Sequence, residues 1–402
     1  LILNGEVIDP TARSGTWADY QLAPTRALYR LEAEGYAPRS LLITPGSDSN
    51  SGLEIKLERE EGQLQLQGEF ATGSRPKSVI FDPDGSIMIV PLLNDTGADV
   101  FSSDGTFITR LEPDPEDAAA HGFVEAIVLE RHEQIWVSQM PGAQIHAFDR
   151  NDYSYLGAVA TGGVMPKVIA TDPDEELLYV SNWATENIGV INPITMEREA
   201  LIQVSGVPRG LAFHPDGRHM YVTLFEGAER GAVEMIDTDV REVVQTMRFL
   251  PGGSARHIIV DAEREIAYVS DMLYARVYAF STRDNTLIRS TNRIGYNLNT
   301  IEMSPDGRYI YVSERGRNNP ETYLVAGPEY GRLIVLDTGD LSIVDWEWGR
   351  NQPTGLDVSP DGSRLVFTDF LDDNLQVYYT DSQRTNDMTA RAETGTEQGA
   401  EQ

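Results

Sequence analysis

The chain has 402 residues, of which 41% are hydrophobic, so it can bury a core of one large domain or of several smaller ones. It contains no cysteine and no run of about 18 apolar residues, which excludes disulfides, cysteine chemistry and an ordinary membrane-spanning helix. The net charge of −31 disfavours nucleic acids and anionic membranes as partners.

The basic residues are unevenly divided between arginine and lysine. Only Lys56, Lys77 and Lys167 are lysines among the 32 basic residues. Acidic, lysine-poor surfaces are typical of proteins from salty environments. A compositional bias of the lineage, without functional meaning, is the alternative.

Residues 1–62 are predicted to form a small β domain. Apolar segments at 28–38, 40–46 and 53–57 are separated by turn residues, which indicates strand, turn, strand, turn and strand. This pattern resembles small immunoglobulin-like, carboxypeptidase-regulatory-like or PEGA modules of exported proteins. Because about sixty residues make a marginal core, we expect this domain to dock against the rest of the chain. An unstructured leader is the alternative.

Residues 63–380 contain a repeat of seven units. Five copies carry a strand followed by Pro-Asp-Gly or a close variant, for example Ser78-Val-Ile-Phe-Asp-Pro-Asp-Gly85, and two copies are degenerate. Aligned on the residue before the turn, the units are 42 to 55 residues apart, which is the length of a propeller blade. The aligned residues are Asp82, Leu129, Asp172, His214, Asp261, Ser304 and Ser359.

Each unit continues with a second strand, which in four units contains Tyr-Val-Ser or Tyr-Val-Thr, as at Tyr179 and Tyr221, and in a fifth the variant Trp136-Val-Ser. A third strand and usually a fourth follow. The Tyr-Val-Ser/Thr motif and its Pro-Asp-Gly turn resemble the YVTN family of repeats, which implies an all-β, seven-bladed β-propeller. The last unit lacks a fourth strand, and we expect residues 63–70, which alternate with a period of two, to complete it and close the ring. Residues 381–402 are polar and are predicted to form a disordered tail.

A ligand site is expected where the innermost strands begin, at one end of the propeller axis. The position five residues before each alignment point is cationic in four of seven units, although acidic residues outnumber basic ones. An anion bound there would gain charge-assisted hydrogen bonds of roughly 1.5–3 kcal/mol each. In blade order these residues are Lys77, Val124, Lys167, Arg209, Arg256, Asn299 and Thr354.

Internal pairing of these cations is the alternative to an anion site. Asp271, Glu314 and Asp369 follow the second strands on the same face and could neutralise the cations. Gln139 and Asn182 occupy corresponding positions.

The loop 315–331 of the sixth unit is long and is expected to cover the axial end or to present a contact surface. Arg315 and Arg317 are its candidate ligand-binding residues. Trp183, in the corresponding loop of the third unit, is a candidate aromatic contact, with packing between blades as the alternative.

Catalysis has little support from the sequence. His257, beside Arg256, and Glu314 are the candidate catalytic residues for a lactonase-like hydrolase or isomerase. No serine-elbow, phosphate-loop or HExxH motif occurs, and we predict neither a cofactor nor a metal site.

The two-domain organisation resembles spirochaetal surface antigens that join an immunoglobulin-like domain to a seven-bladed propeller. This resemblance implies an exported binding or scaffold protein of the periplasm or cell surface, with a lipid anchor possible at a removed N-terminus. The predicted partner is an anionic small molecule or another protein.

Overall fold

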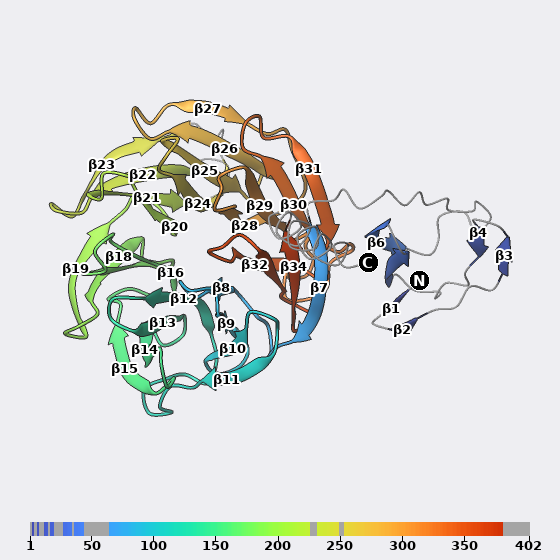
Figure 1. Ribbon diagram of the computed structural model, residues 1–402. Helices are drawn as coiled ribbons and strands as arrows, with labels where there is room; N and C mark the ends of the chain where they lie inside the picture. The colour runs from blue at the N-terminus through green and yellow to red at the C-terminus, as the bar shows by residue number, and fades with distance from the viewer. Residues whose placement is uncertain are drawn as a thin grey trace, which may run out of the picture.

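A computed structural model describes residues 64–225, 231–248 and 253–380, together with six short strands between residues 2 and 43. The described part is all-β and contains no helix, so it has no helix long and apolar enough to cross a membrane. Seven four-stranded antiparallel sheets surround a common axis, which confirms the predicted seven-bladed β-propeller (Figure 1).

The first four blades each place their strands in chain order from the axis outward. Their bounds are β8 (Ile80–Phe81), β9 (Ile87–Pro91), β10 (Ala98–Ser102) and β11 (Phe107–Leu111); β12 (Phe123–Leu129), β13 (Gln134–Gln139), β14 (Gln144–Asp149) and β15 (Tyr155–Ala160); β16 (Pro166–Thr171), β17 (Leu178–Asn182), β18 (Asn187–Asn192) and β19 (Glu197–Gln203); and β20 (Pro208–Phe213), β21 (His219–Leu224), β22 (Ala232–Asp237) and β23 (Glu242–Met247).

The fifth and sixth blades repeat this order, whereas the seventh takes its outermost strand from the start of the propeller. The bounds are β24 (Ala255–Asp261), β25 (Ile266–Asp271), β26 (Arg276–Ser281) and β27 (Leu287–Ser290); β28 (Leu298–Met303), β29 (Tyr309–Glu314), β30 (Arg332–Asp337) and β31 (Ile343–Trp348); and β32 (Pro353–Val358), β33 (Arg364–Asp369), β34 (Asn374–Thr380) and β7 (Leu64–Ala71).

Strand β7 closes the ring by pairing antiparallel with β34, from Leu64 opposite Thr380 to Ala71 opposite Asn374. It supplies the fourth strand that the last repeat lacks, so the seventh sheet has as many strands as the others. Because β7 and β34 are about 300 residues apart in the chain, this pairing ties the two ends of the propeller together.

The core is divided among the seven junctions between neighbouring blades. One cluster of buried apolar side chains lies at each junction, including the junction between the seventh and the first blade. At that closing junction Val366 and Val377 pack with Val79 and Val90. Each blade therefore buries its faces only against its neighbours, which explains why apolar β-branched and aromatic residues dominate the second and third strands.

The Pro-Asp-Gly turns need a residue that accepts positive φ. Gly85, Gly217, Gly307 and Gly362 have φ between 67° and 73°. In the third blade Glu175 takes this position with φ of 54°, and its carboxylate accepts backbone N–H groups from the second blade. The adjacent blade therefore holds a glutamate in a conformation that the other turns leave to glycine.

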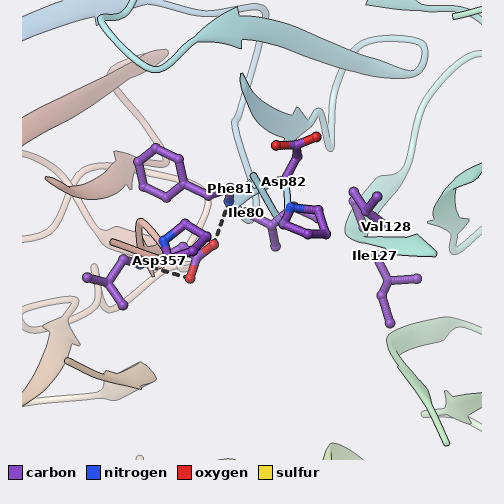
Figure 2. A pocket seen from close by; sticks show the side chains of 10 residues that line it. Ile80, Phe81, Asp82, Ile127, Val128 and Asp357 are labelled. Carbon is purple, nitrogen blue, oxygen red and sulfur yellow. Dashed lines mark hydrogen bonds between the residues drawn. The ribbon is translucent and has the colours of Figure 1, made fainter. Parts of the chain in front are cut away.

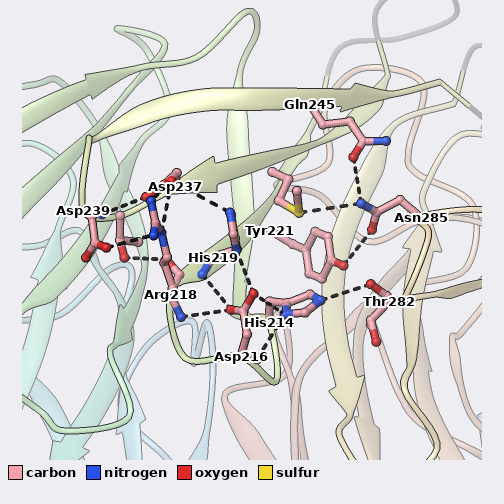
Figure 3. A network of polar contacts seen from close by, with 12 residues as sticks. His214, Asp216, Arg218, His219, Tyr221, Asp237, Asp239, Gln245, Thr282 and Asn285 are labelled. Carbon is pink, nitrogen blue, oxygen red and sulfur yellow. Dashed lines mark hydrogen bonds and ion pairs between the residues drawn. The ribbon is translucent and has the colours of Figure 1, made fainter.

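The turn of the fourth blade also links it to the fifth (Figure 3). His214 accepts the backbone N–H of Asp216 at Nδ1, and its Nε2 donates to the carbonyl of Thr282 at 3.0 Å. Tyr221 donates to Asn285 at 2.7 Å in the same region. These contacts give His214 a structural role, as its place in a turn indicates.

The N-terminal region contains a four-stranded sheet and a separate hairpin. Tyr29 is fully buried. The predicted strand at 53–57 and the predicted tail at 381–402 lie outside the described residues, and the immunoglobulin-like or PEGA-like identity of this region stays a prediction. The strands are β1 (Ile2–Leu3), β2 (Glu6–Val7), β5 (Ala27–Ala33) and β6 (Tyr36–Ile43) in the sheet, with β3 (Ala12–Ser14) and β4 (Trp17–Asp19) in the hairpin.

Candidate functional site

Two sets of equivalent residues surround one end of the axis. The first, which we name the inner ring, consists of the seven residues predicted from the repeat, from Lys77 to Thr354. The second, the entrance ring, consists of the residues that follow the second strands, directly in six blades and one residue later in the first blade. Each entrance-ring residue donates its backbone N–H to the carbonyl two residues before the inner-ring residue of its blade, at 2.8 to 3.3 Å. The entrance ring contains Leu93, Met140, Trp183, Phe225, Met272, Arg315 and Phe370.

The Ser or Thr of the Tyr-Val-Ser/Thr motif holds the inner ring in place. The Ser270 hydroxyl accepts the backbone N–H of His257 and donates to the carbonyl of Asn299 in the next blade, at 2.7 Å. Ser138 makes the same kind of bond to the carbonyl of Lys167, and Ser313 to that of Thr354. The motif therefore fixes Lys167, Asn299 and Thr354 relative to the preceding blade.

Four cations gather at this end of the axis, and we name them the basic cluster: Lys77, Lys167, Arg209 and Arg315. All four are less than 10% exposed. Within the described residues, Glu125 is the one carboxylate in ion-pair reach, with Oε1 at 4.0 Å from Arg209. The Glu125 side chain keeps 24% of its exposure. The cluster is thus buried and holds more basic than acidic side chains.

Burial and mutual repulsion lower the pKa values of these cations. The pKa of Lys77 falls well below its usual value, first because of burial and then because of Arg315, Lys167 and Arg209. Burial and Arg209 also lower the pKa of Lys167, and burial lowers that of Arg315 to about 10. Burial raises the pKa of Glu125, although the cations around it act in the opposite direction.

The carboxylates expected to neutralise the cations are used elsewhere. Asp271 accepts the backbone N–H groups of Ser254 and Leu273, and Glu314 pairs with Arg332 at 2.9 Å. Asp369 accepts a bond from Gln376, and burial raises its pKa to about 8. The alternative that these three carboxylates pair with the inner-ring cations is therefore wrong. The sequence did not single out Glu125, whose one visible signal is its place directly after the inner-ring position of the second blade.

Several predicted site residues lie beside the basic cluster or outside it. Arg256 donates to the side chain of Asn299, which itself donates to the carbonyl of Thr354. Asn182 is buried between Thr161 and Asn187 and bonds to both. Arg317 points away to Glu329, at 3.1 Å. The expectation that Asn182 and Arg317 share a site with the cations is not met, because their polar atoms are bound elsewhere.

Aromatic side chains of the entrance ring lie next to the cations. Lys77 Nζ is 4.3 Å from the centre of the Phe370 ring, and Lys167 Nζ is 5.7 Å from that of Trp183. The Arg256 guanidinium is 5.9 Å from the Phe225 ring. Such cation–π contacts are worth about 0.5–2 kcal/mol. Phe225 and Phe370 were not predicted, although each directly follows a second strand just as Trp183 does.

The loop 315–331 covers part of the axial end. Tyr323 stacks on Phe370 with ring centres 6.3 Å apart and lies 5.8 Å from Lys77 and 5.3 Å from Arg315. Gln352 donates to the carbonyl of Tyr323 at 2.5 Å and accepts a bond from Arg315. The Arg315 Nε atom is buried and has no hydrogen-bond partner within the described residues.

The two catalytic candidates are not joined. His257 donates from Nδ1 to the carbonyl of Ile301 at 3.0 Å, and burial lowers its pKa to about 4. Glu314 is held by Arg332 and by the backbone N–H of Tyr296. No hydrogen bond or ion pair within the described residues connects His257 to Glu314.

Two carboxyl groups lie further along the innermost strands, toward the hairpin turns. Glu302 and Asp357 occupy equivalent positions in the sixth and seventh blades. Asp357 accepts the N–H groups of Phe81 and Val358, and it lines a cavity of about 330 Å³ with Ile80 and other mainly apolar side chains (Figure 2). Burial raises the pKa of Asp357 to about 7. Burial and Asp357 raise that of Glu302.

Comparison with known proteins identifies the family. Antigen Lp49 of Leptospira interrogans is 36% identical over 358 residues, which cover 88% of this chain and 77% of the antigen. The chain belongs to the antigen Lp49 family. A family model described as "Lactonase, 7-bladed beta-propeller" also matches residues 232–397 of the chain.

Relatives of the Lp49-family propeller include enzymes and a distant fold match. The 6-phosphogluconolactonases of Yersinia pestis and Yersinia pseudotuberculosis are 26% identical over 148 residues, which are 34% of this chain and 41% of each enzyme. A chain of Kuenenia stuttgartiensis hydrazine synthase superposes with a TM-score of 0.65 at 17% identity, covering 84% of this chain and 100% of that one. The latter likeness shows the fold alone.

Proposed function

We propose that this chain is an exported binding protein that takes an anionic group, of a small molecule or of an acidic protein, at its basic cluster. The observation that carries the proposal is the imbalance of four buried cations against one carboxylate at 4.0 Å. Buried charges without matching counter-charges are costly, and a bound anion would offset that cost. The unpartnered Arg315 Nε supplies a further donor for such an anion.

The loop 315–331 is proposed to contact the same ligand. Tyr323 lies over Lys77 and Arg315 and keeps 42% of its exposure, so it stands between solvent and the cluster. Its backbone is held to the propeller through Gln352. A ligand that reached Lys77 would therefore meet Tyr323 first.

Membership of the antigen Lp49 family supports a place at the cell surface or in the periplasm for this chain. The relative is named an antigen, which suits a protein exposed to the exterior. The net charge of −31 distinguishes the basic cluster from the rest of the protein, because the cluster is a basic site on a strongly acidic chain. An anion is repelled by most of this surface and is attracted at one place.

A lactonase-like activity is the second candidate, and the family match over residues 232–397 favours it. The geometry gives it less support. His257 is buried with a lowered pKa, and Glu314 is held in an ion pair. An acid or base for lactone hydrolysis must reach the substrate, and neither group is free to do so in this arrangement.

A thermal-shift screen tests both candidates. Inorganic phosphate, sugar acids and lactones would be added at constant ionic strength, and a binding anion should raise the melting temperature by a few degrees. Lys167→Met and Arg209→Met should each remove the shift, whereas Arg131→Met, an exposed arginine, should retain it. No shift with any anion would overturn the proposal. Lactone hydrolysis that Glu314→Gln abolishes would favour the enzyme.

A further inference from the structure

The entrance-ring side chains around the basic cluster are mostly apolar. Six of the seven entrance-ring residues are aliphatic, aromatic or methionine, and Arg315 is the exception. The entrance ring and the inner ring lie at the same end of the axis. An anion that approaches the basic cluster from this end therefore passes among the entrance-ring side chains. The part of the ligand that carries the anion would then lie against apolar surface.

The aromatic side chains are placed beside individual cations. Trp183 is paired with Lys167, Phe225 with Arg256, and Phe370 with Lys77, at 4.3 to 5.9 Å. A ligand whose anionic group bonds to one of these cations would bring its neighbouring atoms next to an aromatic face. Planar or apolar atoms gain from that contact, whereas hydroxyl groups lose bonds to water there.

The polar groups near the axis are already occupied. The Asn299 side chain bonds to Arg256 and to the carbonyl of Thr354, while the Thr354 hydroxyl donates to the carbonyl of Gln352. The Gln352 side chain bonds to Arg315 and to Tyr323. Within the described residues these side chains leave few polar atoms to bind the hydroxyl groups of a sugar acid.

Tyr323 shows how a planar group fits over the cluster. Its ring stacks on Phe370 with an angle of 24° between the planes and lies near both Lys77 and Arg315. The tyrosine therefore occupies, from within the chain, a place beside two cations and an aromatic face.

We infer that the ligand is a hydrophobic anion, an aryl carboxylate or a similar acid with a planar apolar body, rather than a sugar acid or a free inorganic anion. The anionic group binds the basic cluster, and the body lies against Trp183 and the partly exposed entrance-ring side chains around it. This inference rests on the proposed function, because it uses the same cations.

Calorimetric titration with 2-naphthoate, gluconate and inorganic phosphate tests the inference. The two carboxylates carry the same charge on bodies of opposite polarity. Contact with aromatic side chains should make 2-naphthoate bind at least about tenfold more tightly than gluconate. Trp183→Leu should remove most of that difference, whereas Trp346→Leu, on the outer strand β31, should leave it unchanged. Lys167→Met should weaken both carboxylates.

The outcomes separate the inference from the proposed function. Equal affinities for 2-naphthoate and gluconate, both lost in Lys167→Met, would overturn the inference that the ligand has a hydrophobic body. The same result would support the proposed anion site. Binding of 2-naphthoate that Lys167→Met and Arg209→Met leave unchanged would also overturn the inference, because it would place the ligand elsewhere. Absence of binding by every anion would overturn both. Trp183 is partly exposed, so its replacement does not open a buried core.

Discussion

Arg209 and Glu125 form an ion pair between the fourth and the second blade, with NH2 and Oε1 4.0 Å apart. The two blades are not neighbours in the ring, so the pair reaches across the axial region. Glu125 also acts on Lys77 and Lys167, and it thereby serves as a partial internal counter-anion for the basic cluster. An external anion would compete with it for the same donors.

Glu125→Gln should therefore strengthen anion binding while it weakens the fold. Removal of the carboxylate leaves the cations with less compensation, and a bound anion then gains more by replacing it. We expect a severalfold lower Kd for 2-naphthoate and a lower melting temperature without ligand. Glu130→Gln, at an exposed position beyond the end of β12, is the control and should change neither value. Unchanged or weaker binding by Glu125→Gln would show that Glu125 does not compete with the ligand.

Anion binding should be accompanied by proton uptake. The pKa values of Lys77 and Lys167 are lowered in the free protein by burial and by neighbouring cations, and Arg209, Arg315 and Glu125 face the same space. A bound anion favours the protonated amines and raises these pKa values again. Affinity should then fall as the pH rises through the lowered pKa values.

Calorimetry in buffers with different ionisation enthalpies measures this uptake directly. The observed enthalpy should vary with the buffer, and the variation should shrink in Lys167→Arg, since the guanidinium stays protonated. Lowered lysine pKa values also mean that the unfolded chain binds more protons, so stability from these groups rises with pH. An observed enthalpy that does not depend on the buffer would show that anion binding adds no proton to Lys77 or Lys167, and would contradict this prediction.

The sequence predicts the fold closely and the site only in part, and the difference has a physical reason. Repeat spacing fixes which residues are equivalent, so it placed Lys77, Lys167 and Arg209 at one end of the axis. It does not show which carboxylate reaches them. Glu314 and Asp369 are bound within their own blades, because Arg332 and Gln376 on the following strands donate hydrogen bonds to them.

The contacts of the loop 315–331 also could not be predicted from the repeat. No other unit has an equivalent of Tyr323, so no alignment between blades could place its ring over Phe370. Glu125 was hidden for a related reason. It follows Val124, an inner-ring residue of a degenerate unit, and only the folded ring brings it to Arg209 two blades away.

Asp357 should make the protein less stable as the pH rises. Burial raises its pKa to about 7 in the folded protein, above the value of about 3.9 for an unfolded chain. The folded state therefore binds the extra proton, and the stabilisation that is complete below about pH 4 is lost as the pH passes through 7. In Asp357→Asn the loss between pH 5 and pH 8.5 should be smaller, by about 2–3 kcal/mol.

Urea unfolding at the two pH values measures that difference. The amide introduced by Asp357→Asn cannot accept both N–H groups that the carboxylate holds, so the stability of this variant at pH 5 should drop. The comparison therefore uses the change between pH 5 and pH 8.5 within each protein. Asp174→Asn, whose side chain is 73% exposed, should keep the pH dependence of the parent chain. The same pH dependence in Asp357→Asn would assign the effect to Glu302 or to another group.

Two glycines with similar φ should respond differently to alanine. Gly97 and Gly217 have φ of 79° and 73°, so a side chain at either carries backbone strain of roughly 1 kcal/mol. A Cβ on Gly97 would lie 1.8 Å from the carbonyl oxygen of Leu111, whereas on Gly217 it would meet only Pro173 at 3.6 Å. Gly217→Ala should therefore cost about 1 kcal/mol of unfolding free energy, and Gly97→Ala several times more, because β10 and β11 must separate. Urea unfolding of both variants checks this, and equal losses would contradict the close approach of the two strands.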